Sequence, residues 1–370
     1  MARTIGVIGG GQLARMMIVP AIELGLEIKV LAENEGSPAQ LAATQVGDYK
    51  DVATVRAFAK TVDVLTFDHE HVPLDVLETL EAEGFKFEPS SKALRFAQNK
   101  LDMRRRLGEL GVPIPDWAEV NTALELDEFI ASHGSVAILK TPTGGYDGKG
   151  VRVVRSSSDA TDWLSLGKPL LVEEKVDFVR ELAQLSARNR SGDWKAWPLV
   201  QTIQRDGVCA EVLSPAPEAN YVLAAEIAQQ IAVGLDVTGV LAVELFETSD
   251  GKLLVNELAM RPHNSGHFSI EGSVTSQFEQ HLRAVLDLPL GDVTPSSNFA
   301  VMLNLLGTDD KNSFVEHYEA ALSVGVGAHI HTYGKSARAG RKMGHVTALS
   351  NESLADAHAK ATAAYKALQA

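Results

Sequence analysis

The chain has 370 residues, of which 45% are hydrophobic and 22% are charged, and its formal net charge is −14. This composition indicates a globular protein of two or three domains, because single cores rarely grow beyond about 250 residues. The acidic balance argues against general binding of nucleic acid or of an anionic membrane, so any anion site must be a local basic pocket.

Two further classes are excluded by what the sequence lacks. The single cysteine, Cys209, rules out an internal disulfide and a cysteine-based zinc site, and we expect it to be a small buried hydrophobe. Arg3 interrupts the short N-terminus, which argues against a signal peptide. No apolar stretch approaches the ~18 residues that span a bilayer, so we expect a cytoplasmic location.

The first 90 or so residues alternate between strand and helix patterns, which predicts a parallel sheet with helices on its faces, a Rossmann-like domain. Strands are expected at 4–8, 27–32 and 62–67, and a helix at 12–24. Pro89 and Ser90 are suited to begin and cap a helix, which marks a boundary.

The stretch "GVIGGGQLAR" joins the first strand to the first helix. Gly9, Gly11 and Ala14 fill the small-residue positions of G-x-G-x-x-G/A, and Glu33 follows about 20 residues later, as in a dinucleotide-binding fingerprint. By itself this stretch predicts NAD. A glycine turn at a helix N-terminus also suits other anionic or polar ligands, and Glu33 would then have a solvent-facing or supporting role.

The linker "GVPIPDW" precedes a hairpin, "AILKTPTGGYDGKGVRVV", built around a glycine-rich loop at 143–150. Such a loop lets backbone N–H groups approach an anion, like the flap over ATP phosphates in kinases. Lys140, directly before the loop, is suited to pair with phosphate. The alternative is a surface hairpin without a ligand.

The stretch "VEEKVDFVRE" follows as a strand with an acidic edge. Backbone groups of Glu174 and Val176 could bind an adenine ring, and Glu181 could reach a ribose. A solvated acidic edge is the alternative. Beyond it we expect neighbouring strands around Gly192, a long helix at 218–234 and, after a mixed segment, an alanine-rich helix from Ser353.

A second hairpin, "VLAVELFE" and "KLLVNELA", carries two carboxylates in apolar strands. If Asp250-Gly251 is a two-residue turn, Glu244 lies opposite Glu257, with side chains ~5 Å apart. A divalent cation would relieve this repulsion, and Mg²⁺ prefers one or two carboxylates plus phosphate oxygens. Asn256 would add an amide oxygen. The alternatives are solvent-facing carboxylates or a pair neutralised by Arg or Lys.

Two polar segments remain. The loop "MRPHNSGHFSIEG" gathers donors directly after the proposed Mg²⁺ hairpin, which suggests a place where charge develops: Arg261, His263, Asn264, Ser265, Gly266 and His267. The segment "YGKSARAGRKMGH" is a basic patch suited to a phosphate monoester: Lys335, Arg338, Arg341 and Lys342. It has no aromatic platform for nucleic acid, and a solvated turn is the alternative.

The stretches "GGGQLARM", "TGGYDGKG", "NELAMRPHNSGH" and "RAGRKMGH" occur in this order between residues 9 and 345. Together they resemble the ATP-grasp superfamily and, within it, the ATP-dependent carboxylases of purine biosynthesis, the 5-(carboxyamino)imidazole ribonucleotide synthase family. The resemblance implies an α/β and α+β multidomain protein. It would have a Rossmann-like (pre-ATP-grasp) domain at 1–98, an ATP-grasp domain at 99–292 with a lid at about 112–178, and a mixed β/α domain at 293–370.

The resemblance also implies a carbon–nitrogen ligase of IMP biosynthesis. Its substrates would be ATP, bicarbonate and 5-aminoimidazole ribonucleotide, and its products the N5-carbamate, ADP and phosphate, formed through carboxyphosphate. Mg²⁺ would be held by Glu244 and Glu257, and a homodimer without nucleic-acid or membrane partners is implied.

Residue roles carried over from the resemblance fall into three sets. The implied ATP contacts are Lys100, Lys140, Gly145, Tyr146, Asp147, Gly148, Lys149, Gly150, Val151, Glu173, Glu174, Lys175, Val176, Glu181, Gln204, Asn256 and Glu257. The implied ribonucleotide contacts are Gly11, Gln12, Leu13, Glu70, Tyr146, Asp147, Arg261, His263, Asn264, Ser265, Lys335, Arg338, Arg341 and Lys342. The implied catalytic residues are Arg261, His263, Tyr146 and Asp147.

Two positions depart from the family pattern. Lys100 stands where members often have arginine, and Ala339 stands where proline is expected, which leaves the phosphate ligand of the basic patch open. The competing functions are a formate-dependent or amino-acid-dependent ligase of the same superfamily, an NAD-dependent dehydrogenase and a nucleotide sensor without catalysis.

Overall fold

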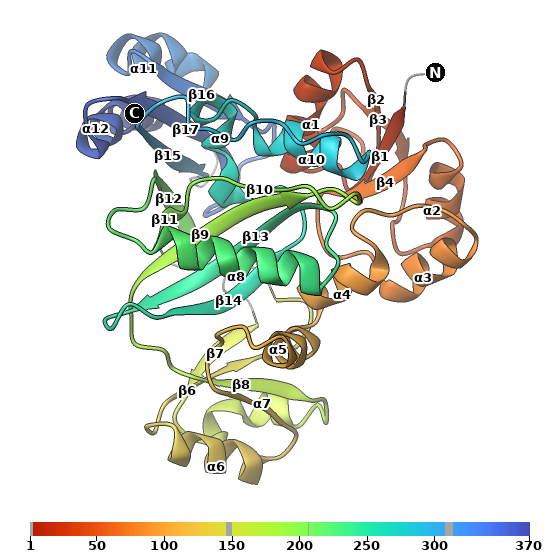
Figure 1. Cartoon of the computed structure of the whole chain (residues 1–370), viewed down its shortest axis with the longest axis vertical. Helices are drawn as coiled ribbons and strands as arrows, with labels where there is room; N and C mark the ends of the chain where they lie inside the picture. Colours follow the sequence, from red (N-terminus) through yellow and green to blue (C-terminus); the bar gives the residue numbers. More distant parts are fainter. Residues whose placement is uncertain (1–2, 146–149, 206, 308–313) are drawn as a thin grey trace.

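The computed structural model describes residues 3–145, 150–205, 207–307 and 314–370 (Figure 1). Within these residues the strands form three sheets. One is in the N-terminal domain, one is in a small lid, and one long sheet contains the strands from β9 to β17. None of the helices described combines the length and the apolarity that crossing a bilayer requires.

The N-terminal sheet is parallel, as the sequence predicts, and its strand order is β3-β2-β1-β4, in which β3 is a strand that the sequence analysis did not identify. Its strands are β1 (Thr4–Ile8), β2 (Glu27–Ala32), β3 (Ala43–Val46) and β4 (Val64–Phe67), and its helices are α1 (Gln12–Glu23), α2 (Val52–Ala59) and α3 (Leu74–Ala82). All five residues of β1 are buried, as expected for an inner strand covered on both faces. The carboxyl end of β1 therefore delivers the glycine-rich turn to the edge of the sheet where ligands bind in such folds.

Two short helices, α4 (Ser91–Gln98) and α5 (Lys100–Glu109), connect this domain to the lid. Ser90 caps α4 by accepting a hydrogen bond from the N–H of Ala93, as predicted for this boundary. Asn99 caps α5 in the same way. In Figure 1, α5 lies between the lid and the long sheet, so its side chains can reach both.

The lid is a four-stranded antiparallel sheet of the order β5-β8-β6-β7. Its elements are β5 (Trp117–Val120), α6 (Ala123–Ser132), β6 (Ala137–Lys140), β7 (Val151–Val154), α7 (Thr161–Leu164) and β8 (Leu170–Glu174). Ala137 pairs with Val154 and Lys140 with Val151, which confirms the predicted hairpin. Among the described residues, the apolar cluster of the lid shares no member with the clusters of the other two sheets, so the lid has its own small core.

The long sheet has the order β14-β13-β9-β11-β12-β15-β17-β16, and β10 pairs with β9. Its strands are β9 (Phe178–Arg188), β10 (Trp194–Ala196), β11 (Val200–Arg205), β12 (Val208–Ser214), β13 (Gly239–Thr248), β14 (Leu253–Ala259), β15 (Phe299–Leu306), β16 (Ala328–Thr332) and β17 (Lys342–Ser350). The accompanying helices are α8 (Tyr221–Gly234), α9 (Ser269–Gly272), α10 (Gln277–Val285), α11 (Tyr318–Val324) and α12 (Leu354–Gln369). Because β12 pairs with β15, the C-terminal segment continues the sheet of the middle segment.

Helix α8 begins at Tyr221, three residues later than the sequence predicts. Asn220 caps it by accepting from the N–H of Leu223, and Glu218 has a positive φ of 50°, which is incompatible with a helix.

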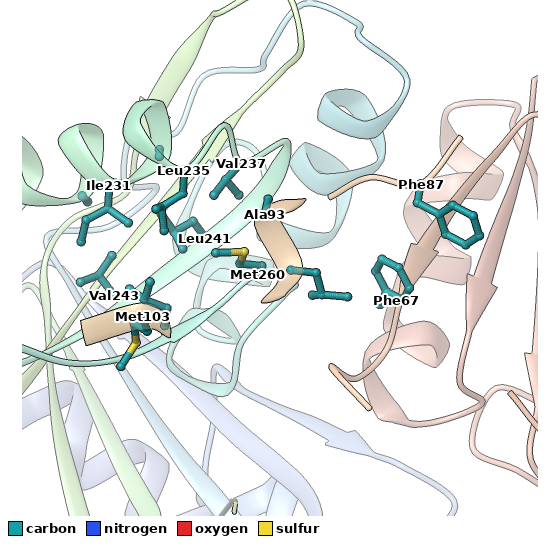
Figure 2. Packing of buried hydrophobic residues seen from close by; sticks show 14 of the residues in the cluster. Phe67, Phe87, Ala93, Met103, Ile231, Leu235, Val237, Leu241, Val243 and Met260 are labelled. Carbon is teal, nitrogen blue, oxygen red and sulfur yellow. The ribbon is translucent and has the colours of Figure 1, made fainter. Parts of the chain in front are cut away.

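One apolar cluster joins the first domain to the long sheet. Figure 2 shows Ile231 and Leu235 of α8, Leu241 and Val243 of β13 and Met103 of α5 in this cluster, which extends to Phe67 and Phe87 of the N-terminal domain. Burying a side chain of this size stabilises the fold by roughly 1.5–3 kcal/mol. The shared cluster therefore holds α5 and the N-terminal sheet firmly against the strands that carry the site.

Candidate active site in the cleft beneath the lid

A cleft of 1240 Å³ is lined by residues of the lid, of the long sheet and of the N-terminal domain. It gathers most of the predicted ATP residues: Lys100, Lys140, Gly145, Val151, Glu173, Glu174, Lys175, Val176, Glu181, Gln204, Asn256 and Glu257. It also gathers Glu70, Glu244, Arg261, His263, Asn264 and Lys342. Segments far apart in the sequence thus meet in one cavity.

Some predicted residues are not part of the lining. Tyr146, Asp147, Gly148 and Lys149 lie outside the described residues. Gly11, Gln12, Leu13, Gly150, Ser265, Lys335, Arg338 and Arg341 are described but do not line this cavity. Cys209 lines the cleft and is half-buried, so the expectation of a buried hydrophobe is wrong for it.

Glu244 of β13 is paired with Glu257 of β14, as the sequence predicts, but for a different reason. The turn is not the two-residue Asp250-Gly251 turn: it spans Ser249 to Gly251, and Thr248 N–H donates to the Lys252 carbonyl at 3.0 Å. This longer turn shifts the register by one residue, so that Leu245 pairs with Val255. A bulge at Asn256 then restores the pairing of the two glutamates, as bulges near active sites re-aim side chains.

The two carboxylates have opposite pKa shifts. Burial raises the pKa of Glu244 to about 7, and the charges of Glu257 and Glu181 add to this effect. Burial acts in the same direction on Glu257, but Lys100 and Lys140 outweigh it and lower the pKa of that carboxyl. Lys100 Nζ lies 2.9 Å from Glu257 Oε1. The alternative interpretation, a pair neutralised by lysine, therefore holds for Glu257, whereas the pKa of Glu244 stays raised.

This arrangement fits a magnesium ion that completes its coordination with phosphate oxygens. Two carboxylates face each other, and the pKa of Glu244 is raised first by burial and then by the charges of Glu257 and Glu181, so a cation bound by the pair would relieve an electrostatic cost. In the described part of the chain, no group of three or more His, Cys, Asp or Glu side chains is placed to hold a metal ion. The residues suit a metal that arrives with a nucleotide.

Lys140 is held in place by a buried ring of polar side chains. Its Nζ lies 2.6 Å from Glu173 Oε2 and donates to Asn256 Oδ1 at 3.2 Å. Glu173 also accepts from Arg104 Nε, and the charges of Arg104 and Lys140 overcome the effect of burial to lower the pKa of Glu173 to about 2. Glu173 was expected to contact ATP, but its carboxylate is occupied with these two cations.

Sequence reasoning missed Arg104. The signal was present, because Arg104 lies three residues after Leu101 and three before Leu107, on the apolar face of α5, where a charged residue needs a buried partner. The partner could not be identified from the helix alone, since Glu173 is 69 residues away.

The expected adenine edge needs a correction at Glu174. Its N–H donates to the Asp116 carbonyl at 2.9 Å, and its carboxylate accepts from the Asp116 N–H at 3.0 Å. The Glu174 amide is therefore unavailable to a base. Lys175 and Val176 follow the end of β8 and line the cleft, so their backbone groups remain the candidates. Glu181 and Gln204 lie further along this wall, on the paired strands β9 and β11.

The loop after β14 presents Arg261 and His263 to the cleft. Arg261 Nε donates to Glu70 Oε2 at 2.7 Å, which fixes the guanidinium. Burial lowers the pKa of His263 to about 3, so the ring is neutral; its Nε2 lies 3.4 Å from Glu244 Oε1 and its Nδ1 lies 2.9 Å from Ser265 Oγ. Ser265 is buried behind His263 and supports the ring, which corrects the expectation of a direct substrate contact.

Asn264 and His267 continue this loop toward the interior. Asn264 exchanges two side-chain hydrogen bonds with Asn304 of β15, at 2.9 and 2.7 Å. His267 is fully buried and its Nδ1 lies 2.9 Å from Gln277 Nε2. Asn264 therefore connects the loop to the long sheet through Asn304, and it also lines the cleft.

Two N–H groups at the glycine-rich turn of the N-terminal domain, those of Gly10 and Ala14, are bound by the protein's own carboxylates. Glu33 accepts from the Gly10 N–H at 3.0 Å and lies 3.0 Å from His69 Nε2. Burial opposes these hydrogen bonds but does not outweigh them, and the pKa of Glu33 is lowered to about 2. Of the two roles expected for Glu33, the supporting one fits, since the side chain holds the turn. Asp68, which sequence reasoning missed, accepts from the Ala14 N–H at 2.7 Å.

The turn and the basic patch are adjacent although Gln12 and Lys335 are 323 positions apart in the sequence. Lys335 Nζ donates to Gln12 Oε1. For the N–H groups of Gly11, Gln12 and Leu13, the described residues provide no hydrogen-bond acceptor. Arg338, in contrast, is exposed, and Arg341 donates to the Ser336 carbonyl at 3.1 Å. Within the basic patch, Lys335 therefore lies at the N-terminal turn, whereas Arg338 lies on the surface.

Three aromatic side chains complete the N-terminal wall of the cleft and were not predicted. Tyr49, His69 and His71 line it, with ring centroids 4.6 Å apart for Tyr49 and His69 and 5.2 Å apart for His69 and His71. The two histidines follow directly after β4, at the carboxyl edge of a parallel sheet, which is where such a sheet places ligand-facing residues.

Comparison with known proteins places these observations in one family. Three family models match: the ribonucleotide synthetase preATP-grasp domain at residues 1–98, the ATP-grasp domain at 105–278 and the phosphoribosylaminoimidazole carboxylase C-terminal domain at 300–360. The N5-carboxyaminoimidazole ribonucleotide synthase of Mycobacterium bovis is 48% identical over 366 residues, which cover 95% of this chain and 85% of that protein.

Solved structures agree with this. The chain superposes with a TM-score of 0.90 on the Aspergillus clavatus N5-carboxyaminoimidazole synthase in complex with ADP and 5-aminoimidazole ribonucleotide, at 34% identity and with 100% and 99% of the two chains covered. The TM-score is 0.88 for the Thermus thermophilus N5-carboxyaminoimidazole ribonucleotide synthetase, at 36% identity and with 98% of each chain covered. The chain therefore belongs to the N5-carboxyaminoimidazole ribonucleotide synthase family, a family of ATP-grasp ligases.

Proposed function

We propose that this chain carboxylates 5-aminoimidazole ribonucleotide with bicarbonate and ATP, giving N5-carboxyaminoimidazole ribonucleotide, ADP and phosphate. The observation that carries the proposal is the pairing of Glu244 with Glu257 in a cleft that also holds Lys140 of the lid and Arg261. A metal-nucleotide and a second, anionic substrate can meet there. Family membership supports the choice of substrates.

In this proposal ATP lies under the lid. Lys175 and Val176 would bind the adenine through their backbone, Glu181 would bind the ribose, and Lys140 and Lys100 would pair with the phosphates. Mg²⁺ held by Glu244 and Glu257 would neutralise the charge that develops as the terminal phosphoryl group is transferred. Lys100 already lies 2.9 Å from Glu257, so a phosphate that binds there exchanges one anionic partner for another.

Bicarbonate is a poor electrophile, and phosphorylation converts it into carboxyphosphate. A bicarbonate oxygen attacks the γ-phosphorus of ATP and ADP leaves. The amine nitrogen of the ribonucleotide then attacks the carboxyl carbon, inorganic phosphate leaves, and the nitrogen loses a proton. Arg261, whose direction is fixed by Glu70, would hold the anionic intermediate. Neutral His263 would sit beside it without adding charge. Because carboxyphosphate is labile, the lid must exclude water.

The ribonucleotide phosphate would bind where the N-terminal turn meets the basic patch. The N–H groups of Gly11, Gln12 and Leu13 lie at the start of α1, where an anion is favoured, and Lys335 is next to Gln12. An NAD-dependent dehydrogenase is disfavoured, because Glu33, the acidic residue that the fingerprint assigns to the ribose, instead accepts from the Gly10 N–H and lies against His69.

The test is ADP release from ATP with bicarbonate and 5-aminoimidazole ribonucleotide, omitting each in turn. We expect release only when both are present. Absence of stimulation by the ribonucleotide would contradict the proposal, and release that requires formate instead of bicarbonate would support the formate-dependent alternative. A homodimer and a cytoplasmic location remain part of the proposal, and sedimentation of the purified chain measures the former.

A further inference from the structure

Arg104 of α5 is fully buried, and its guanidinium joins two parts of the molecule. Nε donates to Glu173 of the lid strand β8. On the opposite side, Nη1 donates to the Val255 carbonyl at 3.0 Å and Nη2 donates to the Asn256 carbonyl at 2.9 Å, both in β14. One side chain therefore connects the lid to the hairpin that carries Glu257.

The two carbonyls are consecutive along the chain, and this is unusual for a strand. In a regular strand, neighbouring carbonyls point to opposite edges, so one planar group cannot bind both. Val255 faces the outer edge of β14, since its N–H donates to the Pro113 carbonyl at 2.9 Å, and the bulge at Asn256 breaks the alternation so that the next carbonyl also binds Arg104. Among the described residues β14 is an edge strand, so no strand lies on the side that these two oxygens face. Arg104 thus satisfies the outward-facing Val255 carbonyl and the Asn256 carbonyl that the bulge turns to the same side.

The register of the glutamates depends on the same bulge. Without it, the three-residue turn would place Asn256, and not Glu257, opposite Glu244, because the pairs nearer the turn are Leu245 with Val255 and Phe246 with Leu254. A slip of one residue also moves a side chain to the other face of a sheet. Whatever stabilises the bulge therefore decides whether the two carboxylates meet.

On the lid side, Arg104 is connected to Lys140 through the carboxylate of Glu173. Glu173 binds Arg104 with one oxygen and Lys140 with the other, at 2.6 Å for the lysine. Lys140 in turn donates to the side chain of Asn256, the bulged residue. The side chains of Arg104, Glu173 and Lys140 close a ring through the backbone carbonyl and the side chain of Asn256, and this ring spans the lid and β14. Met103 and Leu107 anchor α5 in the main apolar cluster. Figure 1 shows α5 between the two parts that this ring connects.

We propose that Arg104 is a positioning residue for phosphoryl transfer, because it locks the β14 bulge that aligns Glu257 with Glu244 and, through Glu173, sets Lys140 above them. This inference rests on the proposed function of the same cleft. Lysine cannot replace it, since an ammonium group lacks the planar set of donors that reaches three acceptors in fixed directions.

The test compares Arg104→Lys with Arg105→Gln, a control on the same helix whose guanidinium is exposed and binds Asp102 and Glu119. We expect Arg104→Lys to lower kcat/KM for ATP and the affinity for Mn²⁺ with ADP by about 10–100-fold, the range found when partners of metal ligands are removed. KM for the ribonucleotide should change less than threefold. Amide hydrogen exchange in 253–259 should accelerate, since the bulge loses an anchor. The control should match wild type in all four measurements.

A second variant, Glu173→Gln, separates the two ends of the clamp. It leaves the bonds from Arg104 to the bulge, so Mn²⁺ affinity should stay within about threefold while KM for ATP rises, because Lys140 loses its anionic partner. If Arg104→Lys retains Mn²⁺ affinity and kcat/KM within twofold, or loses only thermal stability, the proposal is wrong. Mn²⁺ with ADP is measured without the ribonucleotide, so this result stands apart from any failure of the proposed reaction.

Discussion

Glu244 faces Glu257 across the β13–β14 ladder only because a bulge at Asn256 offsets a three-residue turn. The two carboxylates differ in their surroundings, since Lys100 lies against Glu257 and the neutral ring of His263 lies 3.4 Å from Glu244. The pKa values diverge accordingly, to about 7 for Glu244 and below the ordinary value for Glu257. One carboxylate is ready to bind a cation at neutral pH, and the other becomes ready as pH rises.

The first prediction concerns pH. Below about pH 7 the Glu244 carboxyl is protonated in the absence of a cation, so metal must displace a proton to bind. The apparent affinity for Mn²⁺ should therefore rise from pH 6 to pH 8 and level off above the Glu244 pKa. Titration calorimetry in buffers of different ionisation enthalpy measures the proton released.

The control for this experiment is Glu244→Gln, in which the pH dependence should vanish and affinity should fall. His263→Gln should retain the dependence, because the pKa of His263 is about 3 and the ring does not titrate in this range. A pH dependence that disappears in His263→Gln would instead assign it to the histidine.

The second prediction concerns Lys100. Replacing it by methionine removes the cation beside Glu257 and a partner for the nucleotide phosphates, so KM for ATP should rise about tenfold or more, a loss of about 1.4 kcal/mol. Lys100→Arg keeps the charge and should stay within about threefold of wild type. Steady-state kinetics at saturating ribonucleotide measures both, and equal losses for the two variants would mean that charge is not what Lys100 supplies.

The third prediction separates the residues of the basic patch. Lys335→Met should raise KM for the ribonucleotide by about tenfold and leave KM for ATP nearly unchanged, because Lys335 contacts Gln12 at the N-terminal turn. Arg338→Ala is the matched comparison, since Arg338 is exposed and should be silent. If Arg338→Ala gives the larger effect, the phosphate binds on the outer side of the patch.

The fourth prediction concerns the glycine turn. The pKa of Glu33 is lowered from 4.5 to about 2, so its interactions with Gly10 and His69 stabilise the fold above pH 4.5 and are lost as pH falls toward 2. Glu33→Gln should lower Tm by roughly 1–3 °C at pH 7, and the difference should shrink below about pH 4.5. Calorimetric scans from pH 7 down to about pH 2.5 measure this. A difference that grows on acidification would contradict the assigned pairing.

Much of the architecture could be predicted from local patterns. The alternation of strands and helices in the first 90 residues, the hairpin around the 143–150 loop and the capping of α4 by Ser90 all depend on neighbours in the sequence. The ATP-grasp resemblance rested on short stretches of this kind, and the family comparison bears it out. The residue roles that it implied remain predictions, to be tested by the variants above.

The sequence by itself determined which side chains carry the charges, and the tertiary structure decided which of them meet. Glu244 and Glu257 could be paired from a turn rule, yet the rule had the wrong turn and omitted the bulge that compensates for it. Long-range partners are a different matter: those of Arg104, Asp68 and Lys335 are 69, 54 and 323 positions away. No local pattern could identify these partners. The physical reason is that a buried charge must be compensated wherever the fold brings an opposite charge or a free acceptor to it, and distance along the chain does not enter that requirement.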